Sequence, residues 1–334
     1  MAVLVGQIGV GYWGPNLLRN LAASPRIELR KVADSASERQ DFVRTRYPGV
    51  TVVTSADTLL EDEDIDAVVI ATPAANHFDL AMRALDANKH ILVEKPMALT
   101  AAEVREIGSL ARERDLVAMA GHTFLYNDAV LFLKELVDSG ELGELRYVFA
   151  QRLNLGRIRS DVDALWNFGP HDLSIIEFLL DNERPSTVSR MGSAFVQPEV
   201  EDVVFVHLNY PSGAMAHIHL SWLDPHKVRR MTVVGSEKMA VYDDVADYKI
   251  AIYDKGIDPI AVLGTDMDYD APNPQFDLRS GDAVFPSFPM REPLRNEIDH
   301  WVDVIETGAE CRTGPDHAGL IVDILERADN QVPS

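Results

Sequence analysis

The sequence predicts an α/β protein with two domains. The first should be built on a doubly wound parallel sheet, and the second should be an α+β domain on an open, mainly antiparallel sheet. The chain has 334 residues, which is enough for two hydrophobic cores. Its first third alternates short β-branched runs with helical patterns, as parallel sheets do. After about residue 122 the strand patterns become longer and more alternating, which is typical of antiparallel sheets.

The first domain is expected over residues 1–122. Its strands should follow the short apolar runs, at residues 4–10, 28–33, 51–53, 67–71, 90–93 and 117–120. Amphipathic patterns between these runs predict helices at residues 16–23, 36–46, 77–88 and 101–114. Because helices separate the strands, the strands should run parallel and end along one edge of the sheet, where ligands bind in such folds.

The second domain is expected over residues 123–334. A helix at 127–139 should end before Gly140, since glycine is favoured just after a helix. Alternating patterns predict strands at 144–152, 187–196, 202–209, 214–222, 229–234 and 239–243, and helical patterns occur at 171–180, 294–307 and 316–329. The last two helices could pack back on the first domain. Residues 256–292 look irregular, and because so long a loop is unusual we expect short strands there or a contact with a neighbouring subunit.

Composition excludes several classes of function. The formal net charge of −22 disfavours nucleic acid and anionic membranes as partners. One cysteine, Cys311, leaves no internal disulfide or thiolate metal cluster. No apolar run approaches the roughly 20 residues that span a bilayer, and the first ten residues do not resemble a secretory signal. These features predict a soluble, cytoplasmic protein.

A glycine-rich turn follows the first predicted strand. The stretch QIGVGYWGPN contains Gly9, Gly11 and Gly14 in the spacing G-x-G-x-x-G, with Tyr12 and Trp13 inside it. Between a strand and a helix, such glycines allow a tight turn, close approach of the backbone to a pyrophosphate, and close helix packing.

An acidic residue stands at the distance that a dinucleotide site requires. Asp34 lies 20 residues after Gly14 (34 − 14), at the end of the second predicted strand. Its carboxylate could bind the adenosine ribose hydroxyls and repel a 2′-phosphate, which favours NAD over NADP. Arg39 is near enough to weaken that preference. The alternative is a plain glycine turn beside a solvated aspartate.

Polar residues also follow the next strands of the predicted sheet. The stretch ATPAANH supplies Thr72, Pro73, Asn76 and His77, and HILVEKP supplies Glu94, Lys95 and Pro96. His122 follows the last strand of the domain. Because the ends of parallel strands share one edge, these groups should surround the nicotinamide end of the cofactor. The alternative for Glu94 and Lys95 is an ion pair that caps a strand.

Taken together, these motifs resemble those of a known family. The glycine-rich turn, the EKP strand end and a downstream HDLS segment occur in the order typical of Gfo/Idh/MocA oxidoreductases, over essentially the whole chain. The resemblance implies an N-terminal Rossmann domain, a C-terminal open-faced domain and NAD(P)-dependent chemistry on a sugar or polyol. It implies that Lys95 contacts the reacting hydroxyl or carbonyl, and that Glu94 and Pro96 shape the nicotinamide site.

The segment around His171 is expected to supply a general base. Pro170 suits the first position of a helix, so His171 should lie in the first turn, where the helix dipole favours a neutral imidazole. His171 would then take the hydroxyl proton while Lys95 polarises the same oxygen. Many relatives carry an aspartate where this chain has Asn167, which cannot act as a base. The alternative is a histidine that packs a helix end.

Three arginines suggest an anionic substrate. Arg152, Arg157 and Arg159 gather in an otherwise acidic chain and could hold a pyrophosphate or uronate, although a solvated basic loop is the alternative. Asn127, Trp166 and Asn167 are further candidates for substrate binding. These segments resemble the family branch of nucleotide-sugar 3-dehydrogenases, such as those acting on UDP-N-acetylglucosamine or its uronate. That resemblance implies oxidation or reduction at sugar C3. A free sugar or inositol-type polyol dehydrogenase, or an inactive NAD-binding sensor or scaffold, remains the alternative.

Two expectations concern the predicted antiparallel sheet. His217 and His219 share one face of a strand, but pairing of Asn209 with Ala214 would place Val204, Val206 and Leu208 opposite them, so we expect no metal site. The runs 203–208 and 214–222 carry apolar residues on both faces. We therefore expect the sheet to be covered in a homodimer or homotetramer.

Overall fold

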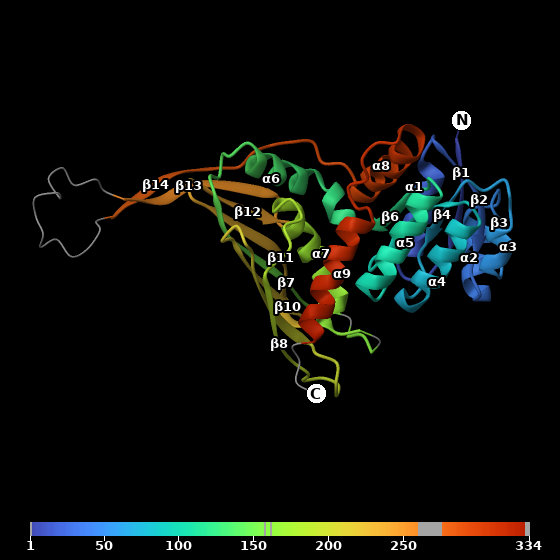
Figure 1. Cartoon of the computed structure of the whole chain (residues 1–334), viewed down its shortest axis with the longest axis horizontal. Coiled ribbons are helices and arrows are strands. Elements are labelled where there is room, and N and C mark those ends of the chain that lie inside the picture. Colours follow the sequence, from blue (N-terminus) through green and yellow to red (C-terminus); the bar gives the residue numbers. More distant parts are fainter. Residues whose placement is uncertain (1, 157, 161, 260–275, 331–334) are drawn as a thin grey trace, which may run out of the picture. The chain divides into compact units, whose positions relative to one another are not determined.

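The structure is a computed structural model that describes residues 2–156, 158–160, 162–259 and 276–330 (Figure 1). The chain forms two compact units. Unit 1 contains Met1–Asp128, Leu173–Phe178 and Met290–Ser334, and unit 2 contains Ala129–Asp172 and Leu179–Pro289. Each unit has its own sheet, as the change of pattern near residue 122 predicts.

The sheet of unit 1 is parallel, as expected. Its strands lie in the order β3-β2-β1-β4-β5-β6, which is the order of a doubly wound dinucleotide-binding sheet. Their bounds are β1 Val3–Ile8, β2 Ile27–Ala33, β3 Thr51–Val53, β4 Ala67–Ile70, β5 His90–Glu94 and β6 Ala118–Gly121. The strand order reverses between β1 and β4, so a crevice for a ligand is expected where these two strands end.

Helices and short 3₁₀ turns connect these strands or follow them along the chain (Figure 1). They are α1 Gly14–Ala23, α2 Ser37–Arg46, α3 Ala56–Leu60, η1 Ala74–Asn76, α4 His77–Asp86, α5 Ala101–Glu113, η2 Thr123–Tyr126, α8 Pro293–Thr307 and α9 Pro315–Asp329. Helix α3 was not predicted, because it has only five residues and shows little periodicity. Its local signal is Ser55, whose hydroxyl caps the helix by accepting the N–H of Asp57 at 3.1 Å.

The two C-terminal helices are part of unit 1. Helix α9 packs so closely against α5 that a Cβ on Gly108 would lie 2.7 Å from the Pro315 side chain. None of the described helices is both long enough and apolar enough to span a lipid bilayer.

The sheet of unit 2 is mainly antiparallel, with one parallel pair, β7–β10. Its order is β14-β13-β12-β11-β7-β10-β9-β8. The bounds are β7 Leu145–Leu155, β8 Thr187–Ser193, β9 Val203–Asn209, β10 Met215–Ser221, β11 Leu223–Gly235, β12 Met239–Asp243, β13 Ile250–Pro259 and β14 Phe276–Val284. Strands β13 and β14 pair across the segment that looked irregular, so short strands do occur there. Residues 260–275 lie outside the described residues.

One strand pairing differs from the expectation. Met215, not Ala214, lies opposite Asn209, so His217 faces His207 and His219 faces Phe205. The turn is one residue longer than expected, with Tyr210 N–H bonded to the Ala214 carbonyl and Gly213 at φ +91°. Side chains alternate between the two faces of a strand, so a shift of one residue changes which residues lie opposite the two histidines. The partly exposed His207 and Phe205 take the place of the buried valines.

The helices of unit 2 include α6 Asp128–Asp138, which ends before Gly140 in the left-handed conformation at φ +73°, as expected. Helix α7, Ala164–Leu179, contributes residues to both units. In Figure 1 no helix is drawn over the outer face of the unit 2 sheet, and that face carries exposed side chains such as Tyr147, Met191 and Met215.

Candidate active site

The glycine-rich turn has the backbone that its motif predicts. Gly9 has φ +94°, and a Cβ there would lie 2.6 Å from the Ala71 carbonyl oxygen at the end of the neighbouring strand. A Cβ on Gly14 would lie 2.9 Å from the Gly9 carbonyl oxygen. Both positions therefore require glycine. Gly11 has open space where its side chain would be, which leaves its backbone accessible.

A buried glutamine holds this turn together. Gln7, on β1, donates from its Nε2 atom to the carbonyls of Gly9 at 2.8 Å and Gly14 at 3.1 Å. It thereby links the start and the end of the glycine-rich turn. Because the side chain is fully buried, replacing it with an apolar residue would leave two backbone acceptors without their donor.

Asp34 is fixed by the same turn. Its Oδ2 atom accepts the Val10 N–H at 2.7 Å, and its Oδ1 atom accepts the Ala36 N–H at 2.9 Å. Each carboxylate oxygen can accept more than one hydrogen bond. The side chain can therefore hold the turn and still bind the hydroxyls of a ribose.

These residues border one cavity of about 420 Å³ in unit 1. The expected cofactor residues that line it are Gly9, Gly11, Asp34, Thr72, Pro73 and Asn76. Tyr12, Trp13 and Arg39 are not among its lining residues, and all three are exposed near the turn. The cavity lies at the reversal of strand order, and an acid, a glycine turn and a helix N-terminus fit the groups of a dinucleotide.

His77 lies beneath this cavity. It is almost completely buried, with Nδ1 2.7 Å from the Pro96 carbonyl oxygen and Nε2 2.9 Å from the Thr72 carbonyl oxygen. Burial lowers its pKa, and the nearby carbonyl groups raise it less. The side chain thus joins the loops after β4 and β5 to each other, and its ring faces these carbonyls.

The end of β5 places Glu94 and Lys95 on the same edge. The Lys95–Pro96 peptide bond is cis. Glu94 lies against β6, where a Cβ on Gly121 would be 3.2 Å from its carboxyl carbon. Burial raises the pKa of Glu94 to about 7, although the Lys95 ammonium opposes this shift. Lys95 directly follows the strand, and its backbone N–H donates to the Glu94 carboxylate at 3.3 Å.

His122 and Asn127 are both buried, with exposed fractions of 2% and 4%. The ring of His122 makes an edge contact with the ring of His317 on α9, at 5.4 Å between centroids. Burial lowers the pKa of His122 well below its usual value. Both side chains are therefore enclosed by the protein, at the two ends of η2.

Helix α7 begins earlier than expected, which corrects the position of His171. The helix starts at Ala164, and Asp163 caps it by accepting the Trp166 N–H at 2.9 Å. His171 is thus the eighth helical residue (171 − 164 + 1), and Pro170 lies inside the helix. Since the helix dipole acts mainly within the first turn, it does not explain a neutral His171.

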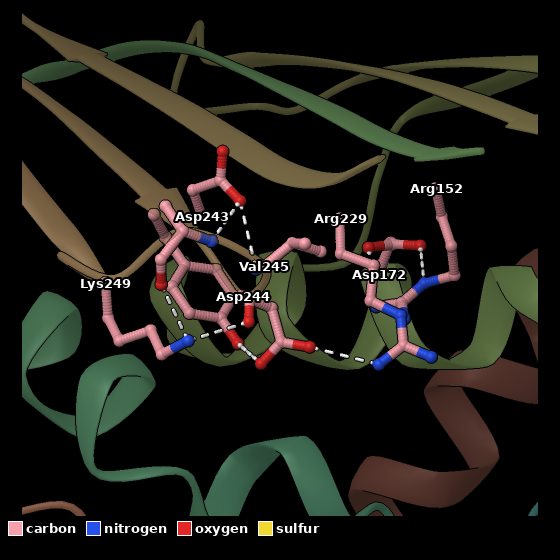
Figure 2. Close-up of polar contacts among 9 residues, drawn as sticks. Arg152, Asp172, Arg229, Asp243, Asp244, Val245 and Lys249 are labelled. Carbon is pink, nitrogen blue, oxygen red and sulfur yellow. Dashed lines mark hydrogen bonds and ion pairs between the residues drawn. The ribbon is translucent and has the colours of Figure 1, made fainter. Parts of the chain in front are cut away.

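Arg152 forms an ion pair within unit 2. Its Nε and Nη2 atoms donate to the two carboxylate oxygens of Asp172 at 2.7 and 3.0 Å, and both side chains are buried (Figure 2). Asp172 directly follows His171 on α7. It pairs with Arg152, because a buried guanidinium needs a carboxylate partner.

A second charged pair lies beside the first (Figure 2). Asp244 accepts the Arg229 guanidinium at 3.0 Å and the Tyr242 hydroxyl at 3.1 Å. Burial of the ring is the main cause that raises the pKa of Tyr242 well above its usual value. The carboxylates of Asp244 and Asp172 raise this pKa further. The first pair joins β7 to α7, and the second joins β11 to the residue that follows β12.

The other expected substrate residues are placed as follows. Arg159 is exposed, and its backbone carbonyl accepts the side-chain amide of Gln197. Trp166 and Asn167 are half-buried in the first turns of α7. Arg157 lies outside the described residues. Among those that the structure describes, no group of three or more His, Cys, Asp or Glu side chains could hold a metal ion.

Two sequence profiles match the chain. The profile described as "Oxidoreductase family, NAD-binding Rossmann fold" matches residues 3–122, and the profile of the GFO/IDH/MocA C-terminal domain matches residues 130–241. The two matches cover more than half of the sequence. The chain belongs to the Gfo/Idh/MocA family of oxidoreductases.

Several Gfo/Idh/MocA relatives act on nucleotide-linked sugars, by their names. The dTDP-3,4-didehydro-2,6-dideoxy-alpha-D-glucose 3-reductase of Streptomyces violaceoruber is 36% identical over 53% of this chain and 55% of its own length. The UDP-N-acetylglucosamine 3-dehydrogenase of Acidithiobacillus ferrooxidans is 31% identical over 75% of this chain and 77% of its own length. The chain spans about half the length of the first two curated relatives it matches.

Solved structures agree with the family. That of the A. ferrooxidans UDP-N-acetylglucosamine 3-dehydrogenase has a TM-score of 0.81 and 25% identity, and covers 99% of this chain and 98% of its own. GenD2 from gentamicin A biosynthesis, in complex with NAD, also has a TM-score of 0.81 and 25% identity, with coverage of 99% and 94%. These likenesses and the first profile agree with NAD as the cofactor of this Gfo/Idh/MocA chain.

Sequence reasoning missed several residues of the site. Gln7 looked like one polar residue in an apolar strand, although its place two residues before Gly9 was a signal. Asp163 is followed by an apolar helical pattern, which could have indicated a helix start. The pairing of Arg152 with Asp172 joins residues 20 positions apart (172 − 152) and had no local signal.

Proposed function

We propose that this oxidoreductase transfers a hydride between NAD and a secondary hydroxyl or ketone of a nucleotide-linked sugar, at sugar C3. The observation that supports this most is the cavity at the strand reversal, where Asp34 and the glycine turn meet. The 31% identity with a UDP-N-acetylglucosamine 3-dehydrogenase supports the sugar and the position.

Lys95 and His171 would act on the same oxygen. In the oxidation direction, the Lys95 ammonium polarises the reacting hydroxyl, and His171 takes the hydroxyl proton as the C–H bond breaks. Bound NAD⁺ supplies the hydride acceptor. In the reduction direction, His171 returns the proton to the oxygen while Lys95 stabilises its developing negative charge. The Asn167 side chain does not ionise and cannot relay a proton, so the proposed relay ends at these two residues.

The other proposed cofactor contacts involve residues of unit 1 in and around the cavity. Thr72, Pro73 and Asn76 lie on the cavity wall, and Glu94 and Pro96 lie at the next strand end. His77 and His122 are buried, so they would shape the nicotinamide site by holding its loops. Tyr12, Trp13 and Arg39 would reach the cofactor from the exposed side of the turn.

The substrate assignment depends on fewer arginines than the sequence suggested. Arg152 already binds Asp172 through two hydrogen bonds, so its role would be to fix α7 next to His171. Arg159, together with Arg157, would bind the anionic part of the substrate. Asn127, Trp166 and Asn167 remain candidates for contacts with the sugar.

The test is the absorbance of NADH during turnover with a substrate panel. We expect reduction of NAD⁺ with UDP- or dTDP-linked sugars and little with the free sugars or inositol. Replacing Lys95 with Met should lower kcat by about 10²-fold or more, because a fixed group that stabilises charge on the reacting oxygen contributes that much. Lys238→Met, which makes the same change at a partly exposed lysine paired with Glu141 and away from the cavity, is the matched control. Equal rates with free inositol would favour the polyol alternative, and NAD binding without turnover would favour the sensor.

We also propose that the chain forms a homodimer or homotetramer through the open face of its second sheet. Met191, Phe205 and His219 lie in one row across β8, β9 and β10, and His207 and His217 lie in the next. Phe205 stacks on His219 at 4.3 Å between ring centroids. Such a set of partly exposed apolar and aromatic side chains suits burial against a second copy.

A further inference from the structure

The cavity of unit 1 extends beyond Asp34 to residues that have no assigned contact with the cofactor. It has a volume of about 420 Å³, and the contacts of the proposed function involve the glycine-rich turn, Asp34 and the loop after β4. Six further lining residues are Ser35 after β2, Thr54 after β3, Ala56 on α3, and Asp79, Leu80 and Arg83 on α4. The part of the cofactor that lies there must be bound by these residues.

The covalent order of a dinucleotide determines which part this is. Gly9 lies against the loop after β4, because a Cβ on Gly9 would be 2.6 Å from the Ala71 carbonyl oxygen. Asp34 directly follows β2, on the other side of β1 in the sheet order. With the diphosphate at the glycine-rich turn and the adenosine ribose at Asp34, the base extends past Asp34. Adenine is therefore the group that reaches Arg83.

Arg83 joins two helices at this part of the cavity. Its Nη1 atom donates to Asp79 Oδ2 at 3.0 Å, one turn earlier on α4, and its Nη2 atom donates to Asp57 on α3. Asp57 is fixed in turn, since its Oδ2 atom accepts the Ser55 hydroxyl at 3.0 Å. The Arg83 side chain keeps an exposed fraction of 39%. The guanidinium is thus held by carboxylates from two helices while part of it stays accessible.

These partners of Arg83 favour a neutral ligand over an anionic one. Both terminal nitrogens already donate to carboxylates, so the planar faces of the guanidinium offer the further contact surface. The single positive charge of Arg83 is outweighed by the carboxylates of Asp57 and Asp79, and Asp34 adds another negative charge to the cavity. A phosphate would be repelled here, whereas an aromatic base can stack on a guanidinium plane.

Uncharged side chains complete the surroundings of a flat ring. Leu80, the residue after Asp79 on α4, is 7% exposed and lines the same cavity. Ala56 lines it from the start of α3, and Thr54 lines it from the end of β3. Small and apolar groups of this kind suit the faces of a purine, which are themselves apolar.

We propose that Arg83 is a further cofactor-binding residue, whose guanidinium plane stacks on the adenine base while Asp57 and Asp79 hold it in place. The inference goes beyond the proposed hydride transfer, and it rests on the proposed contact between Asp34 and the adenosine ribose. Its consequence is a division of labour along the cofactor. Affinity for the adenosine half depends on Arg83, and affinity for the nicotinamide half does not.

Binding of cofactor fragments, without any substrate, tests this proposal. Calorimetry would give dissociation constants for NADH, ADP-ribose and reduced nicotinamide mononucleotide. Arg83→Met should raise those of NADH and ADP-ribose about fivefold or more, because a cation–π contact contributes that much. The constant for the mononucleotide, which lacks adenine, should not change, and this also shows that the variant folds. Arg114→Met, at a similarly exposed arginine paired with Asp86 and away from the cavity, is the matched control.

A second variant, Arg83→Lys, separates stacking from charge. Lysine keeps the positive charge but has no planar guanidinium, so most of the affinity for NADH should still be lost. Wild-type affinity in Arg83→Lys would contradict stacking. Tighter binding of NADPH than of NADH by the wild type, abolished in Arg83→Met, would show that Arg83 binds a 2′-phosphate and would overturn the proposal.

The same measurements separate this inference from the proposed function. If the wild type binds NADH and ADP-ribose but Arg83→Met binds them equally well, the role of Arg83 fails and the hydride transfer stands. An equal loss of affinity for the mononucleotide would also overturn the role of Arg83. If ADP-ribose does not bind to the wild type, both the adenine contact and the cofactor site at Asp34 fail.

Discussion

Asp34 shows how one side chain can serve both the fold and the choice of cofactor. Its two oxygens hold Val10 and Ala36 by their backbone N–H groups, and this fixes the carboxylate at the rim of the cavity. The negative charge at that point would repel a 2′-phosphate. Discrimination between cofactors is therefore built into a residue that the turn itself requires.

We expect the wild type to bind NADH at least about tenfold more tightly than NADPH, a ratio that corresponds to 1.4 kcal/mol. Asp34→Asn should narrow this ratio and also lower the melting temperature, because the amide has one acceptor oxygen where the carboxylate uses two. Dissociation constants from NADH fluorescence would measure the change. Asp41→Asn, on the exposed side of α2, is the control. Tighter binding of NADPH by the wild type would refute the role of Asp34.

Glu94 should make stability depend on pH. Its pKa rises from the usual 4.5 to about 7 on folding, so folding is penalised increasingly as the pH rises between these values. Glu94→Gln should thus gain stability relative to the wild type at pH 8 and little at pH 4. Urea denaturation at both pH values gives this difference, in which the contributions of the buried histidines cancel. A gain of the same size at both would contradict the shift.

Residues with a strong local signal were predictable from the sequence, and those with tertiary partners were not. The glycine spacing and the distance to Asp34 indicated the cavity, because backbone conformation and strand order depend on local pattern. The orientation of the other site residues depends on burial, which local sequence patterns do not show. His77 and His122 follow strand ends as expected but turn inward, and the ring that contacts His122 belongs to His317, 195 residues later in the chain (317 − 122).

At the scale of elements, the strands of unit 1 were predicted to within a few residues because each is a short apolar run between turn signals. The start of α7 was not. Pro170 normally marks a first turn, yet Asp163 caps a helix that begins six residues earlier, at Ala164 (170 − 164), and the proline lies inside it. The β9–β10 hairpin differed for a related reason, since the length of its turn could not be read from the alternating pattern.

The pair Arg152–Asp172 should dominate the stability of the contact between β7 and α7. Replacing Arg152 with Met leaves a buried carboxylate without its partner, which should cost about 3–5 kcal/mol of unfolding free energy. The double variant Arg152→Met with Asp172→Leu should recover most of that loss. Chemical denaturation of the single and double variants measures the coupling.

The matched control for this pair is Arg230→Met, which breaks the more exposed pair with Asp243 on β12. It should cost less than about 1 kcal/mol. Equal losses from Arg152→Met and Arg230→Met would show that burial does not set the strength of the first pair. A double variant no more stable than Arg152→Met alone would show that packing, and not the unpaired charge, causes the loss.

At the scale of the whole molecule, the open face of the second sheet predicts self-association. Phe205→Glu should shift the protein toward monomers, because a charge would enter the row that contains Met191 and His219. Light scattering at micromolar concentration would measure this. Phe42→Glu, which changes an exposed phenylalanine on α2, is the control and should leave the mass unchanged. A monomeric wild type would contradict the proposal.

The route of the chain has a consequence for recombination. The cofactor-binding unit consists of three separate stretches, and its last one, from Met290, carries the helix that packs on α5. A graft of the first 128 residues onto another enzyme would leave that helix behind and expose the α5 face. Exchange of cofactor preference between relatives is therefore expected to succeed by point changes such as those at Asp34, and to fail by transplanting only the first 128 residues.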